Sequence, residues 1–263
     1  MKKISLLSVF FLFFIISCND CKESEDIKRN NHLDMAVLYQ QRAAEYRALC
    51  YQAYNCAAMM LDAQISVDTS ARKKALVFDI DETVLDNSPF EAKCALEGIS
   101  YPDKWDDWCN LSKARPVPGA VKFINDAYNK GIAIFYISNR HETLREATKK
   151  NLLSEGLPLP DDSFLLMKTK ESSKETRREL VIKDYDILLL IGDNLSDFSC
   201  IFDNKLMEER NAIADSLSFE FGKRFIVLPN AMYGDWEGAL YDFNYNISDK
   251  EKDEIRKKLM IRF

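Results

Sequence analysis

Short apolar runs that alternate with stretches of helical spacing dominate the middle of this 263-residue chain. The runs occupy residues 75–80, 132–137, 186–191 and 224–228. Continuous apolar runs between helices are typical of a parallel sheet that is covered on both faces. The pattern therefore predicts an α/β fold in which helices flank a parallel sheet.

Three further segments complete the predicted domain. Residues 33–65 show helical spacing without Pro or Gly, which predicts one long helix or a broken helical pair. About 50 residues separate the first two apolar runs, more than one crossover helix needs, so residues 86–117 are expected to form an insertion that caps the sheet. A capping-box pattern at 248–251 predicts a final helix to about residue 260.

The amino terminus has the pattern of an export signal. Two lysines precede an apolar run over residues 4–16, too short to span a bilayer comfortably. The segment Ile15-Ile16-Ser17-Cys18 resembles a bacterial lipobox, in which the cysteine is lipidated and becomes the new N-terminus; an ordinary cleaved signal is the alternative. We expect a signal peptide at 1–17, a tether at 18–32 that holds the protein on a membrane, and one domain at 33–263.

Composition narrows the possible functions. The net charge is −6, and removing residues 1–17 with their two lysines makes it −8. Basic blocks are absent, so nucleic acid is not an expected partner. The only histidines are His32 and His141, which argues against zincins, histidine phosphatases and Ser-His-Asp hydrolases.

The seven cysteines offer no zinc or thioredoxin-like pattern, because no CxxC occurs. Cys50 and Cys56 lie six positions apart in a predicted helix and are expected to be unpaired. Cys94 and Cys109 could form a disulfide in an oxidising compartment, and the sequence leaves this open.

Polar side chains follow the predicted strands. Asp79 and Asp81 end the first run, and their spacing of two directs both carboxylates the same way. Ser138, followed by Asn139, ends the second run, and Asp193 follows the third. Ligands bind beyond the carboxyl ends of parallel strands, so these groups are expected to meet at one edge. Carboxylates that close repel one another, and a divalent cation relieves the repulsion.

Each feature alone has a simpler explanation. The acidic pair could be a surface turn or a calcium loop, Ser138 a helix cap, and the cations at 168–177 a solvated face. Together they supply a carboxylate nucleophile, a second acid, a hydroxyl, an ammonium and a metal-binding acid. Phosphoryl transfer requires such a set, because it depends on positioning and charge neutralisation.

With these groups in this order, the chain resembles the haloacid-dehalogenase-like (HAD) superfamily. Within that superfamily it resembles the bacterial class C acid phosphatases and lipoprotein 5'-nucleotidases. The resemblance covers roughly residues 33–240 and rests on DIDETVLDNSPF at 79–90 and LLLIGDNLSDF at 188–198. Phe90 stands where a Tyr is typical. The resemblance implies a Rossmann-like HAD core with a small cap insertion and an N-terminal helical segment.

The resemblance also implies catalytic roles. Asp79 would attack phosphorus to form an aspartyl-phosphate, while Asp81 would act as general acid and then as general base. Ser138 and Lys174 would hold phosphoryl oxygens. The neighbouring Lys168 and Lys170 are alternatives to Lys174, which fits the layout of the family best.

The expected cofactor is Mg²⁺. By the resemblance, its ligands would be the Asp79 carboxylate, the Asp81 backbone carbonyl and Asp193. Thr83 and Asp197 would not bind the ion themselves but would orient the groups that do.

Tyr101 and Tyr233 lie near the site entrance in the family, and Asn139 is a further substrate-binding candidate. Two rings there could stack on a base, which predicts a preference for nucleoside or nicotinamide 5'-monophosphates. The alternatives are a broad phosphomonoesterase or phosphotransferase of the same family, and a non-catalytic surface lipoprotein. We expect a lipid-anchored protein of the bacterial envelope, with the outer membrane as its membrane, and relatives suggest a homodimer.

Overall fold

The computed structural model describes residues 31–263. The expected signal peptide, Cys18 and the tether up to residue 30 lie outside the described residues. Within the described part of the chain, no helix combines the length and apolar character that a membrane span requires.

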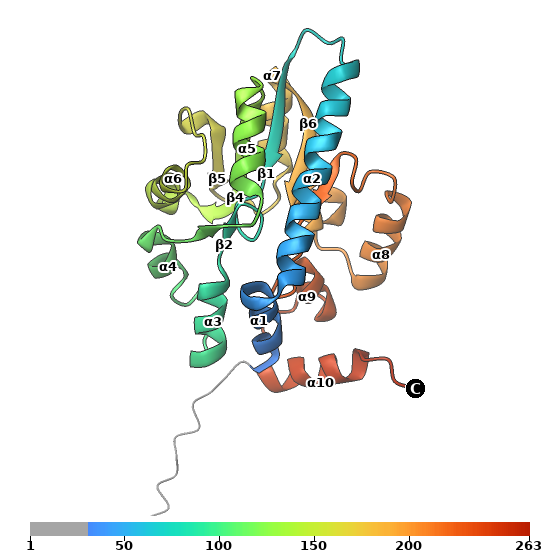
Figure 1. The fold of residues 1–263 in the computed structure, drawn as a ribbon. Helices are drawn as coiled ribbons and strands as arrows, with labels where there is room; N and C mark the ends of the chain where they lie inside the picture. Colours follow the sequence, from blue (N-terminus) through green and yellow to red (C-terminus); the bar gives the residue numbers. More distant parts are fainter. Residues whose placement is uncertain (1–30) are drawn as a thin grey trace, which may run out of the picture.

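A parallel five-stranded sheet forms the centre of the domain (Figure 1), in the order β5-β4-β1-β6-β7. Its strands are β1 (Lys73–Phe78), β4 (Ala133–His141), β5 (Leu165–Lys168), β6 (Tyr185–Gly192) and β7 (Phe225–Val227). The central strand β1 ends with Phe78 paired to Tyr136 of β4 and Ile191 of β6. The carboxyl ends of the three middle strands therefore lie together, which is where the candidate site is built.

Helices cover the sheet and extend from its lower end. In chain order they are α1 (Asp34–Arg42), α2 (Ala44–Val67), α3 (Ser88–Glu97), α4 (Trp105–Leu111), α5 (Ala120–Asn129), α6 (Arg145–Ser154), α7 (Glu175–Asp184), α8 (Met207–Ser216), α9 (Asp235–Leu240) and α10 (Asp249–Leu259). Short 3-10 helices are η1 (Asn31–Leu33), η2 (Glu142–Leu144), η3 (Asp162–Phe164), η4 (Leu195–Asp197) and η5 (Cys200–Phe202).

Both faces of the sheet are apolar because each strand alternates its buried side chains between them. On one face, Leu76 and Phe78 of β1 belong to the large core cluster that includes residues of α2 and α5. On the other face, Ala75 and Val77 belong to a smaller cluster with Val181 of α7. Figure 1 shows α5 and α2 in front of the sheet, to the left and right of β1 in this view, with α7 behind the sheet. The predicted α/β architecture is confirmed.

The segment that follows β1 begins and ends in a two-stranded antiparallel sheet. Strand β2 (Leu85–Asp86) pairs with β3 (Arg115–Pro116), and the chain between them carries α3 and α4. Phe90 of α3 is buried and packs its ring edge-on against Trp105 of α4, with 5.0 Å between the ring centroids. This segment projects from the sheet edge where β1 ends (Figure 1).

The structure refines several sequence predictions. The predicted helical region at 33–65 is a broken pair, because Ala43 adopts extended backbone between α1 and α2. Strand β5 was absent from the predicted set, and β4 runs three residues beyond Ser138 to His141, so Ser138 lies inside the strand. The final helix begins after Ser248, as its capping box predicts. Cys94 and Cys109 are both buried, and no disulfide joins them.

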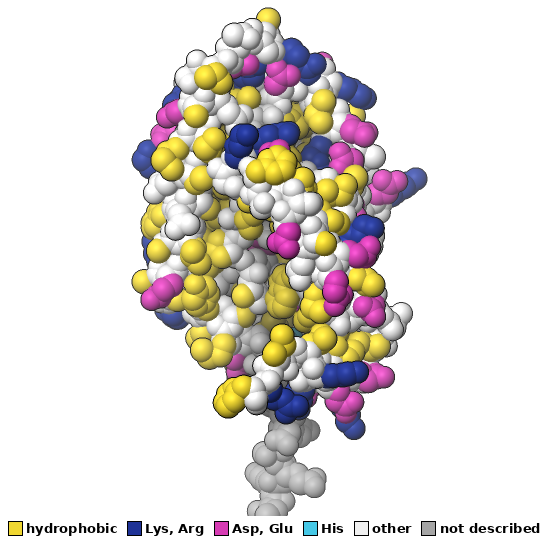
Figure 2. All heavy atoms as spheres, turned by 90° about the vertical axis from the view of Figure 1, so that its right-hand side faces the viewer, with side chains coloured by type: hydrophobic (Ala, Val, Ile, Leu, Met, Phe, Trp, Pro, Cys, Tyr) yellow, Lys and Arg dark blue, Asp and Glu magenta, His cyan; other side chains and the backbone are white. Residues whose placement is uncertain are grey.

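Charges of both signs are mixed over the face shown in Figure 2, where basic and acidic side chains lie interspersed with apolar ones. A large field of one sign is absent from this view of residues 31–263. This face therefore lacks the basic footprint typical of nucleic-acid binding.

Candidate active site

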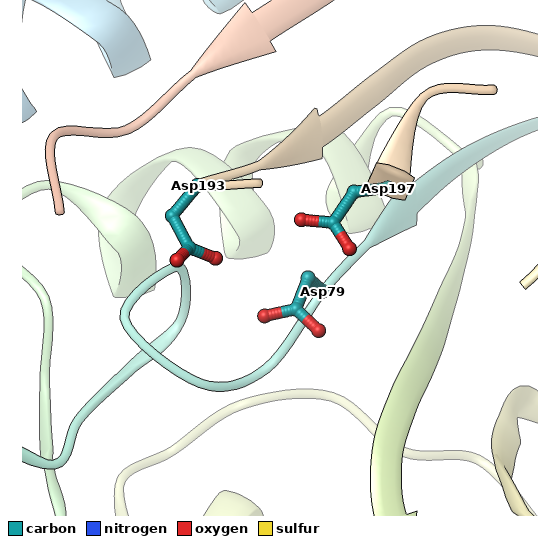
Figure 3. Close-up of side chains that lie close together, drawn as sticks. All are labelled: Asp79, Asp193 and Asp197. Atoms are coloured by element: carbon teal, nitrogen blue, oxygen red, sulfur yellow. The ribbon is translucent and has the colours of Figure 1, made fainter. Parts of the chain in front are cut away.

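Three carboxylates converge at the edge of the sheet (Figure 3). Asp79 directly follows β1, Asp193 directly follows β6, and Asp197 ends η4. One carboxylate oxygen from each lies within 4.8 Å of the others. The backbone N–H of Asp79 donates to the carbonyl of Ile191 at 2.9 Å, which fixes the start of this loop to β6. The two central strands thus bring together acids that are more than a hundred positions apart.

Asp79 and Asp197 are buried and Asp193 is half-buried, and the charges of the three carboxylates repel one another. Burial raises the pKa of Asp79 to about 7, and the charges of Asp197 and Asp81 act in the same direction, while Lys174 opposes them. Burial and the neighbouring Asp197 and Asp79 also raise the pKa of Asp193 well above its usual value. Such a concentration of negative charge favours binding of a cation.

Lys174 supplies one positive charge to this cluster. Its ammonium contacts the carboxylate of Asp79 and lies 2.7 Å from Oδ1 of Asp197. The side chain is 6% exposed; burial disfavours its charge, but Asp197 and Asp79 outweigh burial and raise its pKa. The structure thus places Lys174 at the cluster, whereas Lys170 is exposed and Lys168 is half-buried on β5.

Asp193 is held from two sides. The Thr83 hydroxyl donates to Oδ1 at 3.2 Å, and the Asn230 amide donates to Oδ2 at 2.8 Å. Both oxygens of Asp193 are thus oriented, and one of them lies within 4.8 Å of a carboxylate oxygen of Asp79. The donors available in this cluster are carboxylate oxygens, the ligand type that Mg²⁺ and Ca²⁺ prefer, so the residues fit the expected magnesium ion.

The carboxylate of Asp81 does not join the acidic cluster and instead accepts hydrogen bonds at its own oxygens. Oδ1 accepts from Asn87 at 2.8 Å and from Arg140 at 2.9 Å. The Ser138 hydroxyl lies 3.4 Å from Oδ2. Residue Glu82, which follows, has a φ of 59°, so the chain turns sharply after Asp81.

The two β4 candidates have different surroundings. Ser138 is fully buried, and its hydroxyl accepts the backbone N–H of Arg140 at 3.0 Å in addition to contacting Asp81. Asn139 is exposed, and its side-chain oxygen accepts from Arg177 at 2.7 Å. Only Ser138 therefore reaches the carboxylates, while Asn139 faces the start of α7.

The two aromatic candidates also differ. Tyr101 is 64% exposed, and its ring packs edge-on against Trp105 with 5.9 Å between centroids. Tyr233, in the loop after β7, is partly buried and donates its hydroxyl to the carboxylate of Glu82. The same carboxylate accepts the backbone N–H of Asn87 at 2.8 Å, so Tyr233 is tied to the loop that carries Asp81.

Sequence reasoning missed three residues that hold this site: Arg140, Asn230 and Glu82. Arg140 lies two positions after Ser138 on β4, and the period of a strand directs both side chains to the same side, which was a usable signal. Asn230 and Glu82 act through contacts that span 37 and 151 positions, and local patterns carry no sign of them.

The fold and the site together define a phosphotransfer protein of the HAD type. The chain matches the family described as HAD superfamily, subfamily IIIB (acid phosphatase), over residues 21–236, and it belongs to this family. It is similar to the crystal structure of a class C acid phosphatase from Bacillus anthracis with tungstate bound. The identity is 46% and the TM-score 0.86, over 89% of this chain and 98% of that one.

Curated relatives match over shorter stretches. The stem 28 kDa glycoprotein of Glycine max is 31% identical over 133 residues, which is 48% of this chain and 52% of the relative. Acid phosphatase 1 of Solanum lycopersicum is 25% identical over 166 residues, 60% of this chain and 57% of the relative. The chain thus spans little more than half the length of these relatives.

Proposed function

We propose that the protein hydrolyses phosphomonoesters with Asp79 as the nucleophile and Mg²⁺ as the cofactor. The observation that carries this proposal is the placement of Asp79 between the ammonium of Lys174 and the carboxylate of Asp193. Tungstate, bound by the Bacillus anthracis relative, is an oxyanion like phosphate, and this supports an oxyanion site in the family.

The first half-reaction uses residues gathered at the carboxyl ends of β1, β4 and β6. An Asp79 carboxylate oxygen attacks phosphorus, the bond from phosphorus to the ester oxygen breaks, and Asp81 gives its proton to the departing alkoxide. Lys174 and the Ser138 hydroxyl are placed to donate to phosphoryl oxygens, with Lys174 also holding Asp79 in position. The product is an aspartyl-phosphate and a free alcohol.

The second half-reaction returns the enzyme to its starting state. Asp81, now ionised, takes a proton from water, the water oxygen attacks phosphorus, and the bond to the Asp79 carboxylate breaks. Asp79, Asp193 and the Asp81 carbonyl would hold Mg²⁺, which when bound supplies positive charge against the carboxylates and the phosphoryl oxygens. Asp197 and Thr83 keep Lys174 and Asp193 oriented.

A nucleoside or nicotinamide 5'-monophosphate is the proposed substrate class. The exposed ring of Tyr101 and the Tyr233 ring, which the loop near Asp81 anchors, support this preference. Stacking of a base on an aromatic ring is worth about 1–3 kcal/mol, or roughly tenfold to a hundredfold in kcat/KM.

A pair of variants tests the stacking. Tyr233→Ala should lower kcat/KM for nucleoside monophosphates at least about tenfold relative to p-nitrophenyl phosphate. Tyr233→Phe keeps the ring but removes the hydrogen bond to Glu82, and it should retain the preference. Equal losses on both substrates for Tyr233→Ala would refute stacking. Adding an alcohol acceptor and measuring phosphorylated alcohol distinguishes hydrolysis from phosphotransfer.

Anchoring at the bacterial envelope through a lipid on Cys18 is part of the same proposal. Its support is the lipobox-like segment at 15–18 and the polar stretch that follows it. In cells fed a labelled fatty acid, the full chain should carry the label and fractionate with membranes, and Cys18→Ser should lose both properties. A labelled Cys18→Ser variant would contradict it.

A further inference from the structure

Arg140 is buried beside Asp81, and each of its three side-chain nitrogens has a polar partner. Its side chain is 1% exposed, and both Nε and Nη2 lie 2.9 Å from Oδ1 of Asp81. Nη1 donates to the Thr148 hydroxyl at 3.3 Å, and Nη2 also donates to the Asn87 side-chain oxygen at 3.3 Å. A guanidinium enclosed in this way reaches Asp81 but has no exposed donor to offer a substrate.

Asn87 completes the environment of the same oxygen. Its amide nitrogen donates to Asp81 Oδ1 at 2.8 Å, and its own oxygen accepts from Trp108 Nε1 at 2.8 Å as well as from Arg140. Oδ1 therefore receives hydrogen bonds from two side chains. Oδ2, in contrast, faces only the Ser138 hydroxyl at 3.4 Å among the described side chains that bond to Asp81.

The same contacts reach the segment between β2 and β3. The guanidinium carbon of Arg140 lies 5.6 Å from the centre of the Trp105 ring, a cation–π distance. Trp105 and Trp108 both belong to α4, and Asn87 directly precedes α3. Arg140 on β4 thus connects the carboxylate of Asp81 to the inserted segment.

We propose that Arg140 is a positioning residue that turns Asp81 so that Oδ2 exchanges the proton with the leaving group, with Asn87 and α4 holding this orientation. The inference rests on the proposed phosphatase function. By this inference, α4 helps to hold the proton-transferring carboxylate of Asp81 in place. A residue that merely stabilises the fold would slow all substrates equally, whereas a residue that orients the acid matters most where the leaving group needs a proton.

A series of phosphomonoesters with different leaving groups tests this on the full chain with Mg²⁺. p-Nitrophenolate departs readily without a proton, while an alkoxide requires one. Arg140→Lys should lower kcat/KM, which reports the half-reaction that expels the leaving group, about tenfold or less for p-nitrophenyl phosphate and about a hundredfold or more for alkyl phosphates. Arg145→Lys is the matched control, because Arg145 bonds Glu142 and the Leu165 carbonyl and lies outside the Asp81 contacts. It should leave the ratio between substrates unchanged.

A double-variant cycle locates the effect at Asp81. In the Asp81→Asn background, adding Arg140→Lys should change the residual rate less than about threefold, since the group that Arg140 orients no longer carries the proton. If Arg140→Lys does not fold, Trp108→Phe, which removes the hydrogen bond to Asn87 together with part of the ring that packs against the core, should show the same dependence on leaving group with a smaller loss.

The outcomes separate this inference from the proposed function. Active wild-type protein with equal losses across the series for the folded variants would overturn the role of Arg140 and leave the phosphatase assignment standing. Wild-type protein that releases no phosphate from any ester would overturn the phosphatase assignment itself. Fully additive losses in the Asp81→Asn background would also overturn the positioning role.

Discussion

Asp197 packs its carboxylate directly against the backbone of Gly192. A Cβ at position 192 would lie 2.4 Å from Oδ2 of Asp197 and 2.5 Å from its Cβ. Gly192 ends β6 and precedes Asp193, so the absence of a side chain there lets two acids of the site share a small space. The glycine is required by close approach, since its φ is not in the left-handed region.

Gly192→Ala should therefore displace Asp197 and, through it, Lys174. We expect a loss of about 1–3 kcal/mol in the free energy of unfolding, as for other overpacked core positions, and at least about a tenfold loss of phosphatase activity. The double variant Gly192→Ala/Asp197→Ala removes the clash and should regain stability but not activity. Denaturant unfolding measures the stability, and initial rates measure the phosphatase activity. A Gly192→Ala protein with wild-type stability and activity would contradict the close packing of Asp197 on Gly192.

Lys174→Ala should be among the most damaging substitutions. It leaves two carboxylates buried without their counter-charge, which costs about 3–5 kcal/mol for a buried pair that loses one partner. Lys170→Ala is the matched control, because Lys170 is exposed in the segment just before α7. Thermal unfolding should show a lower Tm, and phosphate release should slow, for Lys174→Ala, while both should stay within error of wild type for Lys170→Ala. Similar behaviour of the two variants would place the functional lysine elsewhere.

Metal binding should stabilise the folded protein, because by our proposal Mg²⁺ would bind the folded acidic cluster and not the unfolded chain. A concentration of 100 times Kd corresponds to about 2.7 kcal/mol, visible as a rise in Tm. Asp193→Asn should abolish most of this rise, while Asp126→Asn, which removes a surface acid paired with Lys122, should keep it. Chelation should silence the wild-type enzyme until Mg²⁺ returns, and an identical rise in Asp193→Asn would exclude Asp193 as a ligand.

Stability should also depend on pH through Glu91. Burial, with Glu237 nearby, raises the pKa of this carboxyl from 4.5 to about 7. Between these values the folded state holds more protons than the unfolded state, so this group lowers stability as pH rises from about 4.5 and exerts its full penalty above about 7.

Glu91→Gln should therefore add about 1–3 kcal/mol to the free energy of unfolding at pH 8 and almost nothing at pH 4.5. Glu97→Gln alters an exposed acid on the same helix, paired with Lys93, and should leave the curve within about 0.5 kcal/mol. Denaturant unfolding at several pH values between about 4.5 and 8 measures this difference. A difference in the free energy of unfolding between wild type and Glu91→Gln that does not change with pH would contradict a raised pKa.

The sequence predicted the class of fold because four of the five strands are apolar runs long enough to stand out from their helical surroundings. Strand β5 was missed because it has only four residues, Leu165–Lys168, and follows a short 3-10 helix. Four residues carry too little periodicity to separate a strand from a loop.

The candidate site was predictable where motif order and strand ends coincide, as for Asp79 and Asp193. The preference for Lys174 over Lys168 and Lys170 came from the layout of the family, and in the structure the Lys174 ammonium contacts the Asp79 carboxylate. Arg140 was missed although its spacing of two from Ser138 was a usable signal, because its partner Asp81 lies 59 positions earlier and the sequence does not show which charged residues are buried.

The most direct test of the account is to trap the phosphorylated Asp79. In Asp81→Asn, p-nitrophenyl phosphate can still phosphorylate the enzyme, since its leaving group needs little proton donation, while hydrolysis slows without the base. Acid quenching and mass spectrometry should find one phosphoryl group on the peptide that contains residue 79, and Asp79→Asn should show neither the adduct nor turnover. A phosphoryl group on another residue, or turnover by Asp79→Asn, would contradict the central claim.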